Sequence, residues 1–413
     1  MKVKKQNYDI TLVNKLLILV LIVGSCLIGT AQETVSLTQA KQKLDQANLS
    51  IAYNAILVNQ AKQAEKSSFT LDPTTVNLGL GQLNGAYADN SFGLIQNFQF
   101  PTVYSKKRNY LEQQTELALT QKQNIKAELD KQLELFFYDY EISEKQKQLL
   151  QFCDSIYAQA VTRQENRFKY GDINTVELGI FQQQRFFIYN ELKQIEIDQN
   201  ETQLNLQLLL NQSQAVIPKL PLDPLVMTTF EFELNNHPLL KVKEAEISVA
   251  EAKIENEKTR LLPSLTLEYA NNSFKGTGSD DNWYNRSNRF HSIRAGVNIP
   301  LFTKARNDIQ VLGLEHQANE QSYLIQELVM KQRIKQLENQ IDQEQLLINY
   351  YQTKMLKPSV IFERIADQFE HGELNYIEFV TLVNQNIDQQ NKFLQILRDY
   401  NSAVILYNYY KVN

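Results

Sequence analysis

An eleven-residue segment occurs twice in the sequence, 201 residues apart, and this duplication limits the possible folds more than any other feature. Residues 167–177 (RFKYGDINTVE) and 368–378 (QFEHGELNYIE) have Phe, Gly, Asn and Glu at the same positions, and three further positions keep their acidic or branched apolar character. Glycine allows a left-handed turn, and Asn or Asp favours the start of the helix that follows. Because each copy separates two long runs with few helix breakers, the repeat predicts two helical hairpins in a duplicated chain.

The composition favours long helices over several compact domains. The 413 residues include only 13 Gly and 9 Pro, and residues 102–170 contain neither. At 1.5 Å per residue, a helix of about 60 residues is roughly 90 Å long, which no single compact domain needs. The formal net charge of −5 provides no basic field, so no nucleic-acid partner is expected.

The first 31 residues have the features of a signal peptide for export. Basic residues precede an apolar stretch at 16–28, and Gly29, Thr30 and Ala31 form a small-residue cleavage site. This stretch is too short for an ordinary membrane span, and no later segment approaches eighteen consecutive apolar residues. Cys26 follows Val-Gly-Ser, which is similar to a lipoprotein cleavage box, so Cys26 becomes either a lipidated N-terminus or part of the removed peptide. Cys153 is the only other cysteine, which excludes a disulfide framework within one chain.

Residues 74–100 and 264–299 show the two-residue alternation of apolar and polar side chains that is typical of β-hairpins. In the first segment, for example, Val76, Leu78 and Leu80 alternate with polar or small residues. A proline borders each segment at both ends, where helical character stops or begins.

The two halves of the chain, residues 32–217 and 218–413, show the same order of expected elements. Each has a helix (residues 37–67 and 237–260), a β-hairpin, a long helix, a glycine turn and a second long helix. Pro358 is expected to kink the long helix that ends at Gly372, and the last helix is expected to reach Tyr410.

The four expected strands indicate a membrane protein. Strands of nine or ten residues with one apolar and one polar face, in an exported chain, are typical of transmembrane β-barrels. Known barrels have at least eight strands, so four strands per chain imply a barrel that two or more copies share. The long helices have narrow apolar stripes and must pack side by side, which would continue the barrel as a tube. The alternative is a small soluble sheet that caps a coiled coil.

Together with the duplicated order, the segments 262–267 (LPSLTL) and 297–300 (VNIP) and the repeated Phe-x-x-Gly-(Asp/Glu)-x-Asn-x-x-Glu tips resemble the TolC family of outer-membrane efflux channels. The resemblance covers the whole mature chain. It implies a mainly α-helical fold with a membrane β-barrel contribution: a homotrimer with a 12-stranded barrel in outer-membrane lipid, continued by an α-helical tunnel across the periplasm of a Gram-negative bacterium. It also implies a periplasmic adaptor (membrane fusion protein) and an inner-membrane pump of RND type as partners.

The same resemblance assigns roles to the two tips. It places the adaptor contact at the tip turns, whose residues here are Arg167, Phe168, Gly171, Asp172, Phe369, Gly372 and Glu373. It places the periplasmic aperture, or gate, at Glu177 and Glu378, six positions after each turn glycine. Alternatively, these acids only complement the dipole of the returning helix. Phe168 and Phe369 are expected to pack within their hairpins, and Arg167 could pair with an acid at a neighbouring tip.

The sequence contains no motif for catalysis, so an enzyme is not expected: it has no Gly-rich phosphate loop, nucleophile elbow or His-Glu-x-x-His. The four histidines have no ligand spacing, so neither a metal site nor a cofactor is predicted. The segment from His237 to Pro263 most resembles the heavy-metal branch of the family, which exports copper and silver or cobalt, zinc and cadmium. Two other functions stay open: the outer-membrane duct of a type I protein-secretion system, and a soluble periplasmic coiled-coil adaptor or structural protein.

Overall fold

The computed structural model describes residues 33–220, 223–227, 234–355 and 357–411. The predicted signal peptide and Cys26 lie outside these residues. The described chain divides into two compact units, a helical unit and a sheet unit. The helical unit takes its described residues from Met1–Leu49, Glu128–Thr229 and Lys335–Tyr409, and the sheet unit takes them from Ser50–Ala127, Phe230–Ile334 and Tyr410–Asn413. Each unit therefore contains segments of both halves of the chain.

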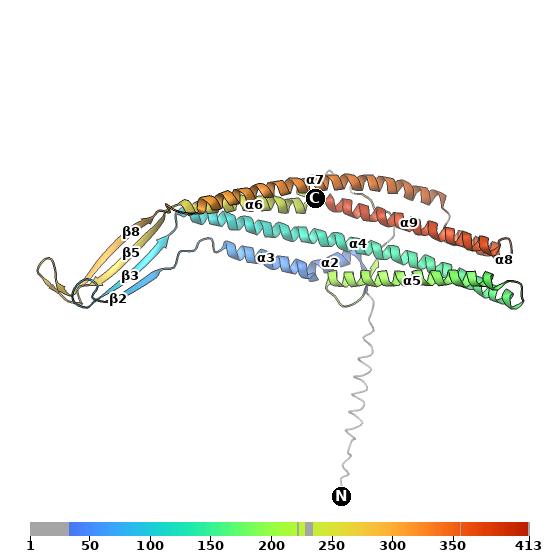
Figure 1. The fold of residues 1–413 in the computed structure, drawn as a ribbon, viewed down its shortest axis with the longest axis horizontal. Coiled ribbons are helices and arrows are strands. Elements are labelled where there is room, and N and C mark those ends of the chain that lie inside the picture. The colour runs from blue at the N-terminus through green and yellow to red at the C-terminus, as the bar shows by residue number, and fades with distance from the viewer. Residues whose placement is uncertain (1–32, 221–222, 228–233, 356, 412–413) are drawn as a thin grey trace, which may run out of the picture. The chain divides into compact units, whose positions relative to one another are not determined.

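The elements follow the order predicted for each half (Figure 1). The first half contains α2 (Leu37–Ala47), α3 (Leu49–Glu65), β2 (Thr75–Gly81), β3 (Asp89–Phe98), α4 (Pro101–Lys169) and α5 (Thr175–Leu210). The second half contains α6 (Pro238–Lys258), β5 (Ser264–Ser273), β8 (Arg289–Asn298), α7 (Ala305–Lys354), α8 (Pro358–Glu370) and α9 (Tyr376–Tyr410). The 69 residues of α4 form one helix because no glycine or further proline interrupts them.

The sheet unit contains a four-stranded antiparallel sheet in the order β2-β3-β5-β8 (Figure 1). The two hairpins predicted from the alternation, β2–β3 and β5–β8, lie side by side through the pairing of β3 with β5. Both outer strands, β2 and β8, have a free edge among the described residues.

The register of the sheet separates an apolar face from a polar face. Paired residues of an antiparallel sheet lie on the same face, and one row across all four strands consists of Val76, Leu94, Tyr269 and Ile293. The neighbouring row, on the opposite face, consists of Thr75, Ile95, Glu268 and Arg294. On that face Arg294 forms an ion pair of 3.4 Å with Glu268. The predicted alternation is therefore confirmed in the structure.

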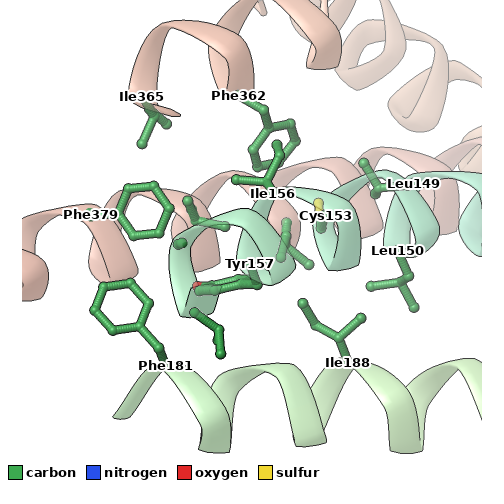
Figure 2. Packing of buried hydrophobic residues seen from close by; sticks show 14 of the residues in the cluster. Leu149, Leu150, Cys153, Ile156, Tyr157, Phe181, Ile188, Phe362, Ile365 and Phe379 are labelled. Carbon is green, nitrogen blue, oxygen red and sulfur yellow. The ribbon is translucent and has the colours of Figure 1, made fainter. Parts of the chain in front are cut away.

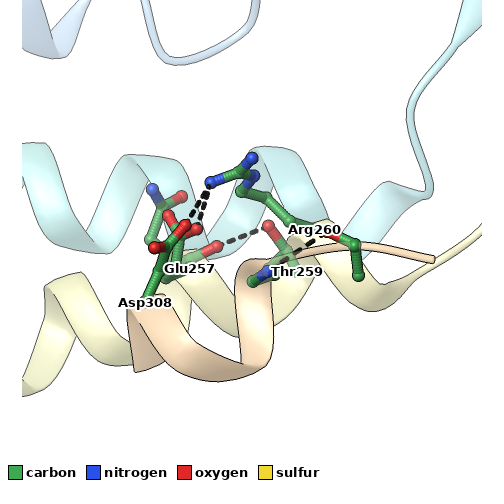
Figure 3. Close-up of polar contacts among 7 residues, drawn as sticks. Glu257, Thr259, Arg260 and Asp308 are labelled. Carbon is green, nitrogen blue, oxygen red and sulfur yellow. Dashed lines mark hydrogen bonds and ion pairs between the residues drawn. The ribbon is translucent and has the colours of Figure 1, made fainter. Parts of the chain in front are cut away.

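Ion pairs hold the helices of the sheet unit together next to the strands. Arg260 lies just after α6 and contacts Glu257 of α6 and Asp308 of α7, the latter at 3.4 Å (Figure 3). Thr259 donates its hydroxyl to the carbonyl of Asn256 at 2.6 Å, which helps to close the helix before the chain enters β5. Lys106 of α4 pairs with Glu255 at 3.0 Å. These groups are partly exposed, so each pair contributes about 0–1 kcal/mol.

The core of the helical unit lies between four helices, α4, α5, α8 and α9. Its central part is an aromatic cluster of Tyr157, Phe181, Phe369 and Phe379, in which the shortest distance between ring centroids is 4.4 Å, from Phe369 to Phe379. Figure 2 shows Tyr157 of α4 beside the rings of Phe181 of α5 and Phe379 of α9. The two hairpins of the duplicated chain thus share one core.

Two helices differ from the sequence-based expectation. The helix expected at 37–67 is divided at Asn48, whose backbone is extended (φ −67°, ψ 125°) and whose side chain donates to the carbonyl of Leu209 at 2.8 Å. The helix expected to bend at Pro358 instead ends at Lys354, and α8 begins at Pro358. Proline lacks an N–H and pushes the preceding residue, Lys357, to an extended ψ of 137°, so the helix breaks.

Two small strand pairs were not predicted. β1 (Glu33–Ser36) pairs in parallel with β4 (Val216–Lys219), and β6 (Gly276–Thr277) pairs with β7 (Trp283–Tyr284) within the long loop of the second β-hairpin. These strands have only two to four residues, which is too short for an alternation pattern.

Cys153 provides a chemical test of the packing of the helical unit. Its thiol is fully buried in the core, and burial raises its pKa to about 12. At pH 8 the raised pKa alone lowers the thiolate fraction by about 10³-fold, and only the thiolate reacts. We expect alkylation with N-ethylmaleimide at pH 8 to leave Cys153 unmodified in the folded protein and to modify it fully in guanidinium chloride. Rapid labelling without denaturant, measured by mass spectrometry, would contradict this core.

Candidate functional site

The first hairpin tip joins α4 to α5 through the predicted glycine turn. Gly171 has a φ of +78°, which side-chain-bearing residues rarely adopt. Its N–H donates to the carbonyl of Phe168 at 3.0 Å, and the N–H of Asp172 donates to that of Arg167 at 3.0 Å, which closes the end of α4. Asn174 then caps α5 by accepting a hydrogen bond from the N–H of Glu177 at 2.9 Å.

The second tip joins α8 to α9 with the same geometry. Gly372 has a φ of +77°, and its N–H donates to the carbonyl of Phe369 at 3.2 Å. Asn375 caps α9, as Asn174 caps α5. Before the turn, Nδ1 of His371 lies 2.9 Å from the carbonyl oxygen of Asp367, and this contact and the Asp367 carboxylate raise the pKa of His371. The sequence repeat is therefore a structural repeat.

The two candidate aperture acids differ in their partners. The Glu378 carboxylate accepts a hydrogen bond of 2.9 Å from the N–H of Asn375 and completes a capping box. The Glu177 carboxylate accepts no hydrogen bond from the described residues, and its side chain is half-buried. Both acids lie in the first turn of the returning helix, but only Glu378 makes a direct hydrogen bond to the start of that helix.

The two tip phenylalanines also differ. Phe369 is buried and packs against Phe181 at 5.6 Å and Phe379 at 4.4 Å, as expected for a residue that packs the hairpin. Phe168, at the matching position, is 41% exposed, so it is less closely packed in the single chain than Phe369. Asp172 and Glu373 are exposed on their turns. Arg167 lies 3.5 Å from the side chain of Gln164, one turn earlier in its own helix.

Two contacts between the hairpins were missed from the sequence. Arg163 of α4 donates from Nη2 to the carbonyl of Glu370, the last residue of α8. Farther from the tip, Tyr157 donates to Asn384 at 3.0 Å, and Asn384 donates to Gln184 at 3.0 Å, so one chain of hydrogen bonds links α4, α9 and α5. Arg163 could have been found by extending the 201-residue comparison upstream, because Arg364 matches it.

Neither a metal site nor a helical membrane span is found among the described residues. They contain no group of three or more His, Cys, Asp or Glu residues arranged to hold a metal ion. His237, for example, caps α6 by accepting a hydrogen bond from the N–H of Leu239 at 3.1 Å. Among the described helices, none is long and apolar enough to cross a membrane.

Solved structures of outer-membrane channels have the same fold. The channel OprN has a TM-score of 0.75 at 12% identity over 91% of this chain and 89% of its own. CmeC of Campylobacter jejuni has a TM-score of 0.72 at 13% identity, with 91% and 85% covered. CusC, described by its conformational changes on folding and channel formation, has a TM-score of 0.67 at 15% identity, with 91% and 92% covered.

These neighbours are TolC-family outer-membrane channels rather than enzymes, so the mainly α-helical fold with a few strands that the resemblance implies for one chain is confirmed. The identities of 12–15% establish likeness of fold alone. No protein-family model matches the sequence, and no curated protein matches it.

Proposed function

We propose that this chain is the outer-membrane channel of a tripartite efflux system, a passive exit duct for small solutes such as drugs or metal ions. The observation that carries the proposal is the four-stranded sheet, which exposes a broad apolar face and leaves both outer strands with free edges. In water such a sheet would aggregate. In a membrane, a closed barrel built from several copies satisfies both features.

The direction of the strands supports a barrel shared between copies. The strands of the sheet alternate in direction from β2 to β8, so β8 of one copy is antiparallel to β2 of the next. The sheet therefore continues from copy to copy without a change of pattern. A barrel requires at least eight strands, which two copies supply, and three copies give the 12-stranded barrel that the resemblance implies.

The exposed side chains of the sheet support contact with lipid. On the apolar face Leu78 is 78% exposed and Ile293 is 76% exposed. The strands β3, β5 and β8 have ten residues each, the length that crosses a bilayer when tilted. The opposite face, which carries Glu268 and Arg294, would line a water-filled pore.

The helical unit supports the remaining parts of the proposal. Two tips of the same geometry, with exposed turns, offer repeated contact points to a periplasmic adaptor, which would connect the channel to an inner-membrane pump of RND type. The channel neighbours favour efflux, and the type I secretion duct remains the second candidate because the same tube would serve it.

Membrane fractionation tests the proposal against the soluble-adaptor alternative. A barrel protein stays in the outer-membrane fraction after a high-salt wash and after a carbonate wash, because its strands are embedded in lipid. A lipid anchor at Cys26 would produce the same result, so the control is the Cys26→Ala variant of the full chain. Retention of this variant supports the barrel. Release of the variant as a monomer would contradict it.

The aperture role of Glu177 and Glu378 predicts a change in ion selectivity. In a trimer the two positions would form a ring of six carboxylates that concentrates cations. We expect Glu177→Gln to lower the cation-to-anion permeability ratio by at least about two-fold. Glu378→Gln should have a smaller effect, because the hydrogen bond from the N–H of Asn375 holds that carboxylate against the start of its own helix. Reversal potentials of single channels in planar bilayers measure both.

Asp172→Asn is the matched control for the aperture prediction, because it removes the same charge from the exposed turn of the same tip. It should leave the reversal potential unchanged. Equal effects of all three substitutions would indicate a general surface charge and would contradict the assignment of an aperture to Glu177 and Glu378.

A further inference from the structure

One contact joins the first half of the chain to the tip of the second half. Arg163 of α4 donates to the carbonyl of Glu370 at the C-terminal end of α8, and its guanidinium lies 6.0 Å from the ring centroid of Phe369. The last carbonyls of a helix carry partial negative charge, and an aromatic ring attracts a guanidinium. Arg163 therefore binds a receptor with two parts, a helix end and a phenylalanine ring.

The duplication supplies a second copy of both the donor and the receptor. A shift of 201 residues places Arg364 on Arg163, Phe168 on Phe369 and Lys169 on Glu370. The receptor also has the same backbone shape in both tips, since the φ values of Gly171 and Gly372 are +78° and +77° and the same two turn hydrogen bonds close each helix.

Both parts of this second contact are open in the single chain. The Arg364 side chain on α8 is exposed and makes no hydrogen bond, ion pair or ring contact with the described residues. Phe168 is 41% exposed, whereas its equivalent is buried beneath Arg163 and its neighbours. The tip of the second half is already bound by Arg163 of the same chain. Arg364, the equivalent of Arg163 in the second half, therefore needs the tip of the first half of another chain as its partner.

We propose that Arg364 binds the tip of a neighbouring copy of this chain, where it donates to the carbonyl of Lys169 and stacks on Phe168, as Arg163 does within the chain. The contact joins two different surfaces, so repetition closes a ring of tips in which intrachain and interchain contacts alternate. This inference rests on the proposed oligomeric channel and adds the contact that holds its periplasmic end.

One difference between the two contacts determines where the ring is weaker. The intrachain receptor ends in Glu370, whose carboxylate attracts Arg163, whereas the interchain receptor ends in Lys169, whose ammonium repels Arg364. The interchain contact is therefore the weaker of the two.

Cysteine crosslinking in the full chain tests the contact. The Arg364→Cys and Lys169→Cys variants are co-expressed on separately tagged chains and treated with a short bis-maleimide, because an arginine spans more than a disulfide can. We expect covalent dimers that carry both tags, and no dimers from either single variant alone. The native Cys153 is buried and does not interfere. The matched control, Arg163→Cys with Glu370→Cys in one chain, should give an internal crosslink without a covalent dimer.

Native mass spectrometry of the same uncrosslinked samples in detergent separates this inference from the proposed function. If the protein is oligomeric but Arg364→Cys and Lys169→Cys give no mixed covalent dimer, the Arg364 contact is overturned and the shared barrel is left intact. Protein that stays monomeric would overturn the shared barrel itself. Dimers formed by Arg364→Cys alone would indicate a symmetric contact and would also overturn the inference.

Discussion

The Leu78→Arg variant is expected to be lost from the outer membrane. Leu78 lies in the middle of β2 on the apolar face, opposite Phe92, and is 78% exposed in the single chain. An arginine on the lipid face of a barrel near the bilayer midplane costs about 2–4 kcal/mol, and an oligomer has one in every copy. We expect at least a ten-fold decrease in oligomer recovered from salt-washed outer membranes, measured by quantitative immunoblotting.

Asn77→Arg is the matched control, because the neighbouring residue of the same strand lies on the polar face. In the proposed barrel this arginine would point into the water-filled pore, so the variant should assemble to nearly the wild-type level. Equal accumulation of Leu78→Arg and Asn77→Arg would mean that lipid does not cover the apolar face. Equal loss of both variants would also contradict the assignment of the two faces, since either face would then be equally intolerant of charge.

The Phe181→Ala variant is expected to destabilise the helical unit. Phe181 is fully buried and packs against both Phe369 and Phe379, with ring centroids 5.6 and 5.7 Å away. Removing a buried phenylalanine ring costs about 3–5 kcal/mol, because apolar contact is lost and a cavity remains. Hydrogen exchange of the amides in α5 and α9 should become about 10²–10³-fold faster, since exchange in stable helices reports the free energy of opening.

Val176→Ala is the control for this substitution. Val176 lies nearer the start of α5 and is 67% exposed, so its truncation should change stability by no more than about 0.5 kcal/mol. Unchanged exchange in Phe181→Ala would contradict the shared core of the two hairpins. Faster exchange confined to α5 would contradict the coupling of the first hairpin to the second.

The parts of the fold that the sequence predicted are those with a long periodic signal. Seven to ten alternating residues define each of the four main strands, and the run without glycine or proline after Pro101 defines α4. The tip turns could be predicted because only glycine tolerates the φ values of Gly171 and Gly372 at little cost.

The parts that could not be predicted depend on contacts between distant residues. Asn48 divides α2 from α3 while its side chain binds the carbonyl of Leu209, 161 positions away. The pairing of β1 with β4 joins segments too short to show a pattern of their own. At Pro358 the sequence indicated a disturbance, but a kink and a full break have the same local signal.

At the tips, the sequence predicted equivalence and the structure revealed asymmetry. Glu177 and Glu378 occupy matching positions, yet only Glu378 caps its helix. Phe168 and Phe369 also match, yet only Phe369 is buried in the core. Phe369 is covered because a single chain brings the two halves together once, whereas the contact of Glu378 with Asn375 lies within its own tip. This asymmetry can be recognised only in three dimensions.

Single-channel recording tests the central claim most directly. Purified full-length oligomer is added to one side of a planar lipid bilayer, and the current is recorded at fixed voltage in potassium chloride. Wild-type protein should give discrete, cation-selective conductance steps, and the Leu78→Arg variant should give at least about ten-fold fewer, because little of it assembles in the membrane. Absence of steps from wild-type protein that is folded, oligomeric and embedded in the bilayer would contradict the claim that this chain forms a channel.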